Sequence, residues 1–397
     1  MSPDPVPPDA VRLEVLAARF RGFDVGDPLY RVLCATIAAR PDWLAMLWQA
    51  PRGQQLPNLW LAALHDRVLA GSEHPLREYF ASVGGSRAPD AALAALLAGF
   101  VESEQAALLD AIRSRRTQTN EIGRCAVLWP ALCWIAHRHG VRELALFDLG
   151  CSAGLNLGVD RYRYTYRGAG ADSKSETAAE TAAETAAEVD DDPARATGLP
   201  EPPRLVCRTV GPLALPSTEP APRIVARLGV DPAPVDVADA RALRWLRACI
   251  WPHDRARDRR LLQAAALAQR ERWPVRAADD CLAAVAPWLD TLPAGVLPVV
   301  FNSWVLHYFE PAALAAHCAG MTALMRERGV VWLSAEGPHV RIAPLAVPPP
   351  HEAASDPVAM TLWTCGAAAD GGALRFELLA RSHAHGHWLE WLAAQPG

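Results

Sequence analysis

What the sequence lacks narrows the class of protein. Among its 397 residues there is no uncharged apolar run of the about 18 residues that a membrane-spanning helix needs. The nine cysteines are an odd number and form no Cys-x-x-Cys pair. Residues 1–10 are proline-rich and acidic, whereas a secretory signal is basic and then apolar. We therefore expect a cytoplasmic protein that is not held in a membrane.

The chain also lacks a strong charge of either sign. Its formal net charge is −5, its pI is about 6.2, and its arginines are scattered. A nucleic-acid partner is not expected, because such proteins carry a massed basic surface. Hydrophobic residues make up 51% of the chain, which is ample for two or three domains with sizeable cores. A small-molecule substrate is the expected partner, and the oligomeric state is left open.

Periodicity divides the chain into two regions. From Val11 to about Gly140 apolar residues recur at helical intervals, as Leu13, Leu16 and Phe20 do. We expect an all-helical N-terminal domain over residues 1–140. Apolar strands then alternate with helical stretches over residues 141–397, which predicts an α/β domain. Strands are expected at residues 144–148, within residues 223–232, 274–281 and 297–308, and at residues 329–336, 359–365 and 374–382.

The stretch from Leu144 to Leu157 organises the second region. Its first four apolar residues predict a buried strand, and Asp148 follows at the carboxyl end, where open α/β sheets bind ligands. A helix should come next and direct its N-terminus at the same place. The residues between are small enough for the backbone to approach a ligand. They are Gly150, Ser152, Ala153 and Gly154.

The spacing of this loop indicates which ligand to expect. The pattern acid-x-Gly-x-Ser-x-Gly resembles the first motif of class I S-adenosyl-L-methionine (SAM)-dependent methyltransferases, with Ser152 in place of the middle glycine. The dinucleotide fingerprint Gly-x-Gly-x-x-Gly does not fit, which disfavours an NAD-dependent oxidoreductase. The loop is also compatible with an ordinary strand-to-helix turn.

Four strings taken together resemble an uncharacterised bacterial domain-of-unknown-function family, and the match covers nearly the whole chain. The resemblance implies a class I methyltransferase-like Rossmann fold with a sheet of about seven strands. It implies nothing about the substrate. The strings are residues 118–121, residues 148–156 with 160–164, residues 246–252 and residues 385–391.

Acids after two later strands complete the expected SAM site. Asp231 ends a Gly-x-Asp sequence similar to the second methyltransferase motif, in which a carboxylate accepts both ribose hydroxyls. Asp236 or Asp239 could hold this role instead, and an Asp-Pro pair is also an ordinary turn starter. Asp279 and Asp280 resemble the third motif, in which one aspartate accepts the adenine amino group.

The loop after the strand at residues 297–303 is expected beside the methyl group. Asn302 and Ser303, with Asn156 of the first loop, are counted among the cofactor contacts. The sequence Asn302-Ser303-Trp304 faintly resembles the Asn-Pro-Pro-aromatic motif of amino-group methyltransferases. Because both prolines are missing, we infer no amino acceptor.

The candidate catalytic residues are His307, Tyr308 and Glu121. The imidazole of His307 is suited to removing a proton near neutral pH. Tyr308 and Trp304 could bracket an acceptor, or the sulfonium through cation–π contact. The alternative for His307 is a packed, hydrogen-bonded side chain.

Residues 117–124 place several polar groups directly before an apolar helix. We expect Glu121 to reach over the cofactor cleft, and Asn120 and Arg124, like Trp304, to bind substrate. The alternative is local: Thr119 or Asn120 would cap the helix, and Glu121 would complement its dipole.

His383, His385 and His387 alternate near the end of the chain. On a strand this spacing would put three imidazoles on one face, an arrangement that can hold a metal. Because the nearby sequence offers no fourth ligand, no metal is expected.

These patterns favour a SAM-dependent methyltransferase with a small-molecule acceptor. The alternative is a non-catalytic module that binds SAM or another nucleotide as a sensor or partner scaffold. An open polar pocket beside His307 and Asn302 would distinguish the enzyme from the module.

Residues 169–203 form an acidic, low-complexity insert. Four glutamates recur every fourth residue, so on a helix they would lie nearly in line and repel, with only alanines to bury. We expect this insert to be disordered and solvated.

Deleting residues 173–191 should therefore leave the melting temperature and cofactor affinity nearly unchanged, because the segment offers no apolar face for packing. Thermal melts of the deletion variant and the full chain test this. A loss of several degrees would show that the insert packs.

Overall fold

The computed structural model describes residues 8–23, 26–118, 120–168, 201–351 and 360–395. The chain forms two compact units: residues 1–119 with 238–259, and residues 120–237 with 260–397. Residues 169–200 of the acidic insert, and Thr119, lie outside the described residues. No helix within the described ranges is both long and apolar enough to cross a membrane.

The first unit is helical in its described residues. Three of its helices begin at a proline, which suits the first turn because the N–H groups there have no intrahelical partner. The core includes Trp60, Leu64 and Phe80, all fully buried. The elements are α1 (Ala10–Arg21), α2 (Pro28–Ala38), α3 (Pro41–Trp48), α4 (Pro57–Leu69), η1 (Pro75–Tyr79), η2 (Ala81–Val83), α5 (Leu93–Ser114) and α8 (Ala240–Ala248).

Helix α8 belongs to this first unit although it lies far along the chain. Trp245 is 4% exposed in the helical core, and its indole donates to the Arg116 carbonyl at 2.8 Å. Arg244 forms an ion pair with Asp66 of α4 at 2.9 Å. These contacts complete the helical unit with residues that follow β4 in sequence.

The second unit is built on one sheet of ten strands in the order β2-β3-β10-β9-β8-β7-β6-β1-β4-β5. The α/β class is confirmed. The strands are β1 (Glu143–Leu149), β2 (Arg163–Arg167), β3 (Arg204–Val210), β4 (Arg223–Asp231), β5 (Val275–Ala277), β6 (Leu297–Ser303), β7 (Val331–Glu336), β8 (Met360–Ala368), β9 (Leu374–His383) and β10 (Trp388–Trp391).

The expected count of about seven strands is wrong, because β2, β3 and β10 were not anticipated. Strand β2 alternates tyrosine with arginine or threonine, β3 follows the insert, and β10 has only four residues. None has the long apolar run that identified the central strands. Strand β3 pairs in parallel with β2 on one side and with β10 on the other. The three strands extend the sheet past β9, the last of the predicted strands on that side.

The parallel centre of the sheet fixes where a ligand site can lie. Strands β5-β4-β1-β6-β7 are all parallel, and the order of the strands along the chain reverses direction between the paired strands β1 and β6. Strand β8 is antiparallel to β7 and β9 is antiparallel to β8, so β9 runs in the direction of β7. The carboxyl ends of β1, β4, β6, β7 and β9 therefore share one edge.

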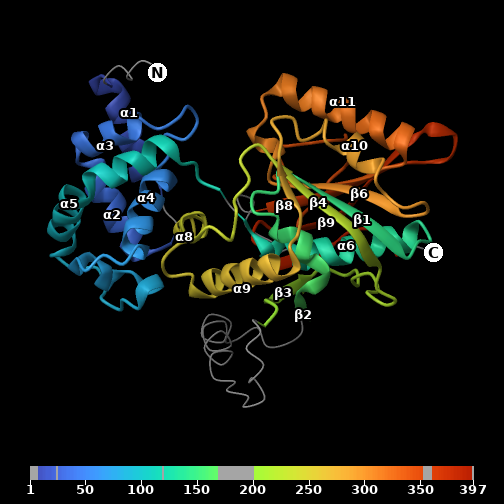
Figure 1. The fold of residues 1–397 in the computed structure, drawn as a ribbon, viewed down its shortest axis with the longest axis horizontal. Coiled ribbons are helices and arrows are strands. Elements are labelled where there is room, and N and C mark those ends of the chain that lie inside the picture. The colour runs from blue at the N-terminus through green and yellow to red at the C-terminus, as the bar shows by residue number, and fades with distance from the viewer. Residues whose placement is uncertain (1–7, 24–25, 119, 169–200, 352–359, 396–397) are drawn as a thin grey trace, which may run out of the picture. The chain divides into compact units, whose positions relative to one another are not determined.

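Helices cover both faces of this centre, with α10 and α11 on one side and α6 on the other (Figure 1). Phe147 and Trp332 of the sheet pack in one core with Trp288 of α10 and Met321 of α11. The helices are α6 (Cys125–Arg138), α9 (Arg255–Glu271), α10 (Val285–Leu289) and α11 (Pro311–Arg328). Short 3₁₀ segments are η3 (Ile122–Arg124), η4 (Leu155–Arg161), η5 (Leu306–Tyr308) and η7 (Asp370–Gly372). Segment η7 lies in the turn of the predicted β8–β9 hairpin.

A buried ion pair joins β9 to the short strand β10. The Arg381 guanidinium lies 2.7 Å from the Glu390 carboxylate, with side chains 1% and 7% exposed. Arg381 also donates to the carbonyls of Pro348 and Pro349. The charge is thus compensated in a place that water does not reach.

Arg381→Ala should destabilise the second unit by about 3–5 kcal/mol, because it leaves the Glu390 carboxylate buried without its counter-ion. The matched control is Arg375→Ala on the same strand, whose side chain is 60% exposed and pairs with Glu377. An exposed pair contributes at most about 1 kcal/mol. Urea denaturation followed by circular dichroism measures both; equal losses would contradict the prediction.

Candidate functional site

The loop after β1 has an unusual backbone. Gly150, Ser152 and Gly154 have φ values of +74°, +52° and +67°, a region that side-chain-bearing residues seldom adopt. At Gly154 a Cβ would lie 2.6 Å from a methyl of Val275 on β5, so the position requires glycine for packing as well as for conformation. Ala153 lies between the last two and is 4% exposed. The small residues singled out in the sequence therefore do form a tight turn.

The amide groups of this loop bond within the protein. Gly150 N–H and Cys151 N–H donate to the Val230 carbonyl, and Gly154 N–H donates to Cys151. The Ser152 N–H donates to Oδ2 of Asp231 at 2.8 Å. The turn is thus fastened to the end of β4, and these four amides face protein acceptors where ligand contacts were expected.

The α-helix expected after the loop is wrong: the chain forms the short 3₁₀ segment η4 and then enters β2. Within η4, Gly158 packs closely on the Trp273 ring, where a Cβ would lie 1.9 Å away. No helical N-terminus is therefore directed at the site from this position. Asn156 in η4 accepts a hydrogen bond from the Cys125 thiol at 3.4 Å.

Asp148 ends β1 and is 2% exposed. Its Oδ2 is buried and has no hydrogen-bond partner among the described residues. Burial, and then the charge of Asp231, raises the pKa of Asp148 well above its usual 3.8, while Arg124 opposes the rise. The site therefore contains an acid that holds its proton more firmly than a solvated one.

Asp231 ends the neighbouring strand β4 and is 9% exposed. Its two carboxylate oxygens each accept a backbone N–H at 2.8 Å, from Ser152 and from Ala233. These bonds hold Ser152 in its strained conformation, the kind of backbone that is retained only when the surroundings enforce it. Asp236 is exposed, and Asp239 caps α8 by accepting the Arg241 N–H.

Glu336 at the end of β7 organises the loop after β6. Its buried Oε1 accepts from the Asn302 amide and from the N–H groups of Val305 and Leu306, at 2.7–3.0 Å. Asn302 is 1% exposed and also accepts from the Trp332 indole. Its side chain is therefore enclosed and positions the loop.

The second oxygen of Glu336 faces His307. Its Oε2 lies 3.8 Å from Nδ1 of His307, and both atoms are buried without a hydrogen-bond partner among the described residues. A small movement would close this gap to a hydrogen bond. Such a bond would orient the imidazole with Nε2 available to accept a proton, as in other acid–histidine pairs.

Aromatic rings flank this histidine. The centroid of Tyr308 lies 3.7 Å and that of Trp304 5.4 Å from the His307 ring. Tyr308 is 68% exposed, whereas Trp304 donates its indole N–H to Thr361. Trp304 also has a positive φ of 58°. Both aromatic rings thus lie next to His307, and their predicted contact with an acceptor or the sulfonium stays a prediction.

Arg124 links three segments at this edge of the sheet. Its guanidinium donates to the Ala384 carbonyl at 2.8 Å, and to the carbonyl and hydroxyl of Ser303 at 3.2 and 2.9 Å. It also lies 5.8 Å from the centre of the Trp304 ring. Arg124 is 4% exposed, so its position is fixed by these contacts.

The residues next to Arg124 pack closely on the β9–β10 turn. A Cβ at Gly123 would lie 2.1 Å from the His385 carbonyl oxygen, and one at Gly386 would lie 2.0 Å from the Gly123 oxygen. Glu121 is 2% exposed and caps η3 by accepting the Gly123 N–H, whereas the cap considered from the sequence was Thr119 or Asn120. Asn120 donates to the Cys151 carbonyl at 3.3 Å.

The three histidines lie in this turn. Strand β9 ends at His383, and the chain reverses before β10 begins at Trp388. The expectation that His383, His385 and His387 share one face of a strand is therefore wrong; a turn brings them together. One ring nitrogen from each of the three lies within 4.8 Å of the other two.

Asp279 and Asp280 follow β5 and are both exposed. Asp280 accepts the N–H groups of Leu282 and Ala283 and so closes a turn. The structure thus assigns a local role to one acid of the pair. Both lie at the end of the edge strand, separated from β1 by β4.

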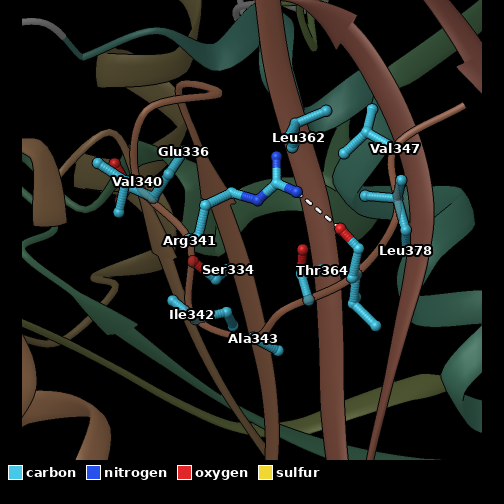
Figure 2. A pocket seen from close by; sticks show the side chains of 11 residues that line it. Ser334, Glu336, Val340, Arg341, Ile342, Ala343, Val347, Leu362, Thr364 and Leu378 are labelled. Atoms are coloured by element: carbon cyan, nitrogen blue, oxygen red, sulfur yellow. Dashed lines mark hydrogen bonds between the residues drawn. The ribbon is translucent and has the colours of Figure 1, made fainter. Parts of the chain in front are cut away.

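A small pocket lies beside Glu336, between β7, β8 and β9 (Figure 2). The Arg341 side chain reaches across it to the Leu345 carbonyl at 2.6 Å. The remaining space accommodates about one water molecule. Neither His307 nor Asn302 lines this pocket. It is therefore not the open polar pocket that would distinguish an enzyme from a binding module.

The family model of DUF2332, described as an uncharacterized protein conserved in bacteria, matches residues 23–391. The chain belongs to this family. The resemblance inferred from the four sequence strings is thereby confirmed as a bacterial family of this kind. No curated protein and no solved structure matches the chain.

Glu336 was not among the site residues predicted for this DUF2332 chain. It ends an apolar strand at the edge where Asp148 ends another, so the rule applied to β1 would have found it. The hydrogen bonds of Glu336 to the β6 loop depend on strand order, which the sequence does not contain.

Asp148→Asn should stabilise the protein increasingly as pH rises from 4 to 8. Because burial and Asp231 raise the pKa of Asp148, the folded state keeps this proton longer than the unfolded state does. The associated stability is fully present below about pH 3.8 and is lost as pH rises through the folded pKa. Asparagine has no such proton to lose.

Melting temperatures of parent and variant across this pH range test the prediction; each kcal/mol corresponds to about 2–4 °C. Asp279→Asn, the same substitution at an exposed position, is the control. An Asp148→Asn difference that shrinks as pH rises would contradict the argument.

Proposed function

We propose that this chain binds SAM at the carboxyl ends of β1, β4 and β6 and transfers its methyl group to a small-molecule acceptor. The order β5-β4-β1-β6-β7 is third-second-first-fourth-fifth along the chain, the order of doubly wound nucleotide-binding sheets. A class I methyltransferase-like fold has this parallel centre. The acid-x-Gly-x-Ser-x-Gly loop follows its first strand.

The observation that carries the proposal is the state of Asp148. Its Oδ2 is buried without a hydrogen-bond partner among the described residues, and its pKa is raised by burial first. A cationic ligand would stabilise the ionised carboxylate and supply the missing partner. SAM carries a sulfonium and an ammonium group, whereas a neutral nucleotide offers no such charge.

Bound SAM would supply an electrophilic methyl group, which leaves with its bond electrons remaining on sulfur. The chain chiefly has to align an acceptor with that carbon and exclude water. His307 can take the proton that a hydroxyl or amine acceptor loses, provided that Glu336 orients its ring. Trp304 and Tyr308 flank His307 and could hold the acceptor.

A non-catalytic SAM-binding module is the second candidate. It is favoured by the enclosed Asn302 and by a neighbouring pocket with room for about one water. The two candidates differ in one measurable respect. Only the enzyme forms S-adenosylhomocysteine from SAM when offered a panel of phenols, amines and carboxylic acids, and His307→Ala should abolish this without changing SAM affinity.

Calorimetric titration should give micromolar binding of SAM or S-adenosylhomocysteine, about −8 kcal/mol. SAM affinity should also rise with pH, because the ligand's positive charge favours the ionised form of Asp148, whose pKa is raised by burial. If neither compound binds at millimolar concentration while a nicotinamide dinucleotide does, the cofactor proposal is wrong.

A pair of adjacent variants tests the orientation of the cofactor. Asp279→Ala should weaken SAM binding about tenfold by removing the acceptor for the adenine amino group, and should leave the melting temperature unchanged. Asp280→Ala is the matched control: it removes the acceptor for two backbone amides, so it should lower stability by about 1 kcal/mol and leave affinity unchanged. The opposite pattern would place adenine elsewhere.

A further inference from the structure

The β9–β10 turn concentrates three imidazoles at the ligand-binding edge of the sheet. One ring nitrogen from each of His383, His385 and His387 lies within 4.8 Å of the other two. The rings of His383 and His387 are parallel, 4.3 Å apart, and His385 meets them nearly edge-on at 5.4 and 6.0 Å. Nothing in the proposed methyl transfer uses this cluster.

We propose that this turn is a binding site for a divalent transition-metal ion, with Zn²⁺ the principal candidate. Imidazole nitrogen is a preferred ligand of Zn²⁺, and three histidines with one open position form a known type of zinc site. Among the described residues, the cluster includes no fourth histidine, cysteine or acid. A water molecule or a small ligand would therefore take the fourth position.

The backbone that carries the cluster is held firmly, which is what a metal site requires. The close approach of Gly386 to Gly123 leaves no room for a side chain at either position. Between the first two histidines, the Ala384 carbonyl accepts from Arg124 at 2.8 Å. Ser382 donates to the His383 carbonyl and accepts from the Trp363 indole.

Binding requires only side-chain rotation. Zinc–nitrogen bonds of 2.0–2.1 Å in a tetrahedron put the nitrogens about 3.3 Å apart, so the rings would close by up to about 1.5 Å. His383 Nδ1 accepts the His385 N–H at 3.0 Å, and the ring has to turn to present a lone pair to the metal. His387 is exposed and can turn towards the other two.

The histidine turn lies at the edge of the sheet where the SAM site is proposed. Strand β9 ends at the same edge as β1, β6 and β7, and Arg124 bonds both to the histidine turn and to Ser303 beside Trp304. Arg124 therefore connects the turn that would hold the ion to the loop that carries His307. The metal site goes beyond the proposed methyl transfer and does not depend on it.

The test uses the full chain without a histidine tag, stripped of metal by a chelator and titrated with ZnCl₂ in a calorimeter. The expected result is one Zn²⁺ per chain. Co²⁺ serves as a second probe, because its visible absorption bands report nitrogen coordination in a tetrahedral site. A parent protein that binds no Zn²⁺ would overturn the proposal.

His387→Gln is the decisive variant because its exposed side chain can be changed without disturbing the fold. Loss of this ligand should weaken Zn²⁺ binding by at least about 100-fold and remove the Co²⁺ spectrum. His139→Gln is the control: this exposed histidine precedes the amino end of β1, at the opposite edge of the sheet, and its loss should change neither. Parent-like Zn²⁺ binding by His387→Gln and by His385→Gln would show that the ion binds elsewhere, whatever the outcome with SAM.

Discussion

The hydrogen bonds of the buried Arg124 guanidinium hold together the edge of the sheet at which the parallel strands end. A charge that is 4% exposed is tolerated only when its donors are satisfied, and they are directed to backbone and hydroxyl oxygens of Ser303 and Ala384. Segments nearly 260 residues apart in sequence are joined in this way. Lysine, a point charge without a planar fork, could not make the same set of bonds.

Around this arginine the chain accepts several features that cost stability. Ser152 and Trp304 have positive φ values, Asp148 is a buried acid, and Glu336 has one oxygen turned to a histidine that it does not quite reach. Such features tend to gather where a protein binds or reacts, because selection retains them against their cost. Here they gather at the carboxyl ends of neighbouring strands, the position that a doubly wound sheet assigns to its ligand.

The parts of the fold that could be predicted are those with a clear local sequence pattern. Apolar runs located β1, β4, β6 and β7, and the Asp370-Gly371-Gly372 turn located the β8–β9 hairpin. Strands without such a run were not found, because β2, β3 and β10 become strands through pairing with one another.

The candidate site was predictable in composition but less so in arrangement. The acids after β1 and β4 were identified from the sequence, whereas the bond from Asp231 to Ser152 depends on two strands lying side by side. The histidines were noticed from their spacing, but their convergence results from a chain reversal that the spacing alone did not reveal. The close packing of Gly158 on Trp273 was not predicted either, because the two residues are far apart in the sequence.

The discontinuous first unit has a consequence for how the chain can fold during synthesis. Helix α8 contributes Trp245 to the core of that unit, and the ribosome adds it only after β1 to β4 have been made. At about 5–20 residues per second, the five earlier helices would wait several seconds for their last partner. During that interval the apolar surface that Trp245 later covers would be open to chaperones, and a nascent chain that stalled before α8 would keep it open.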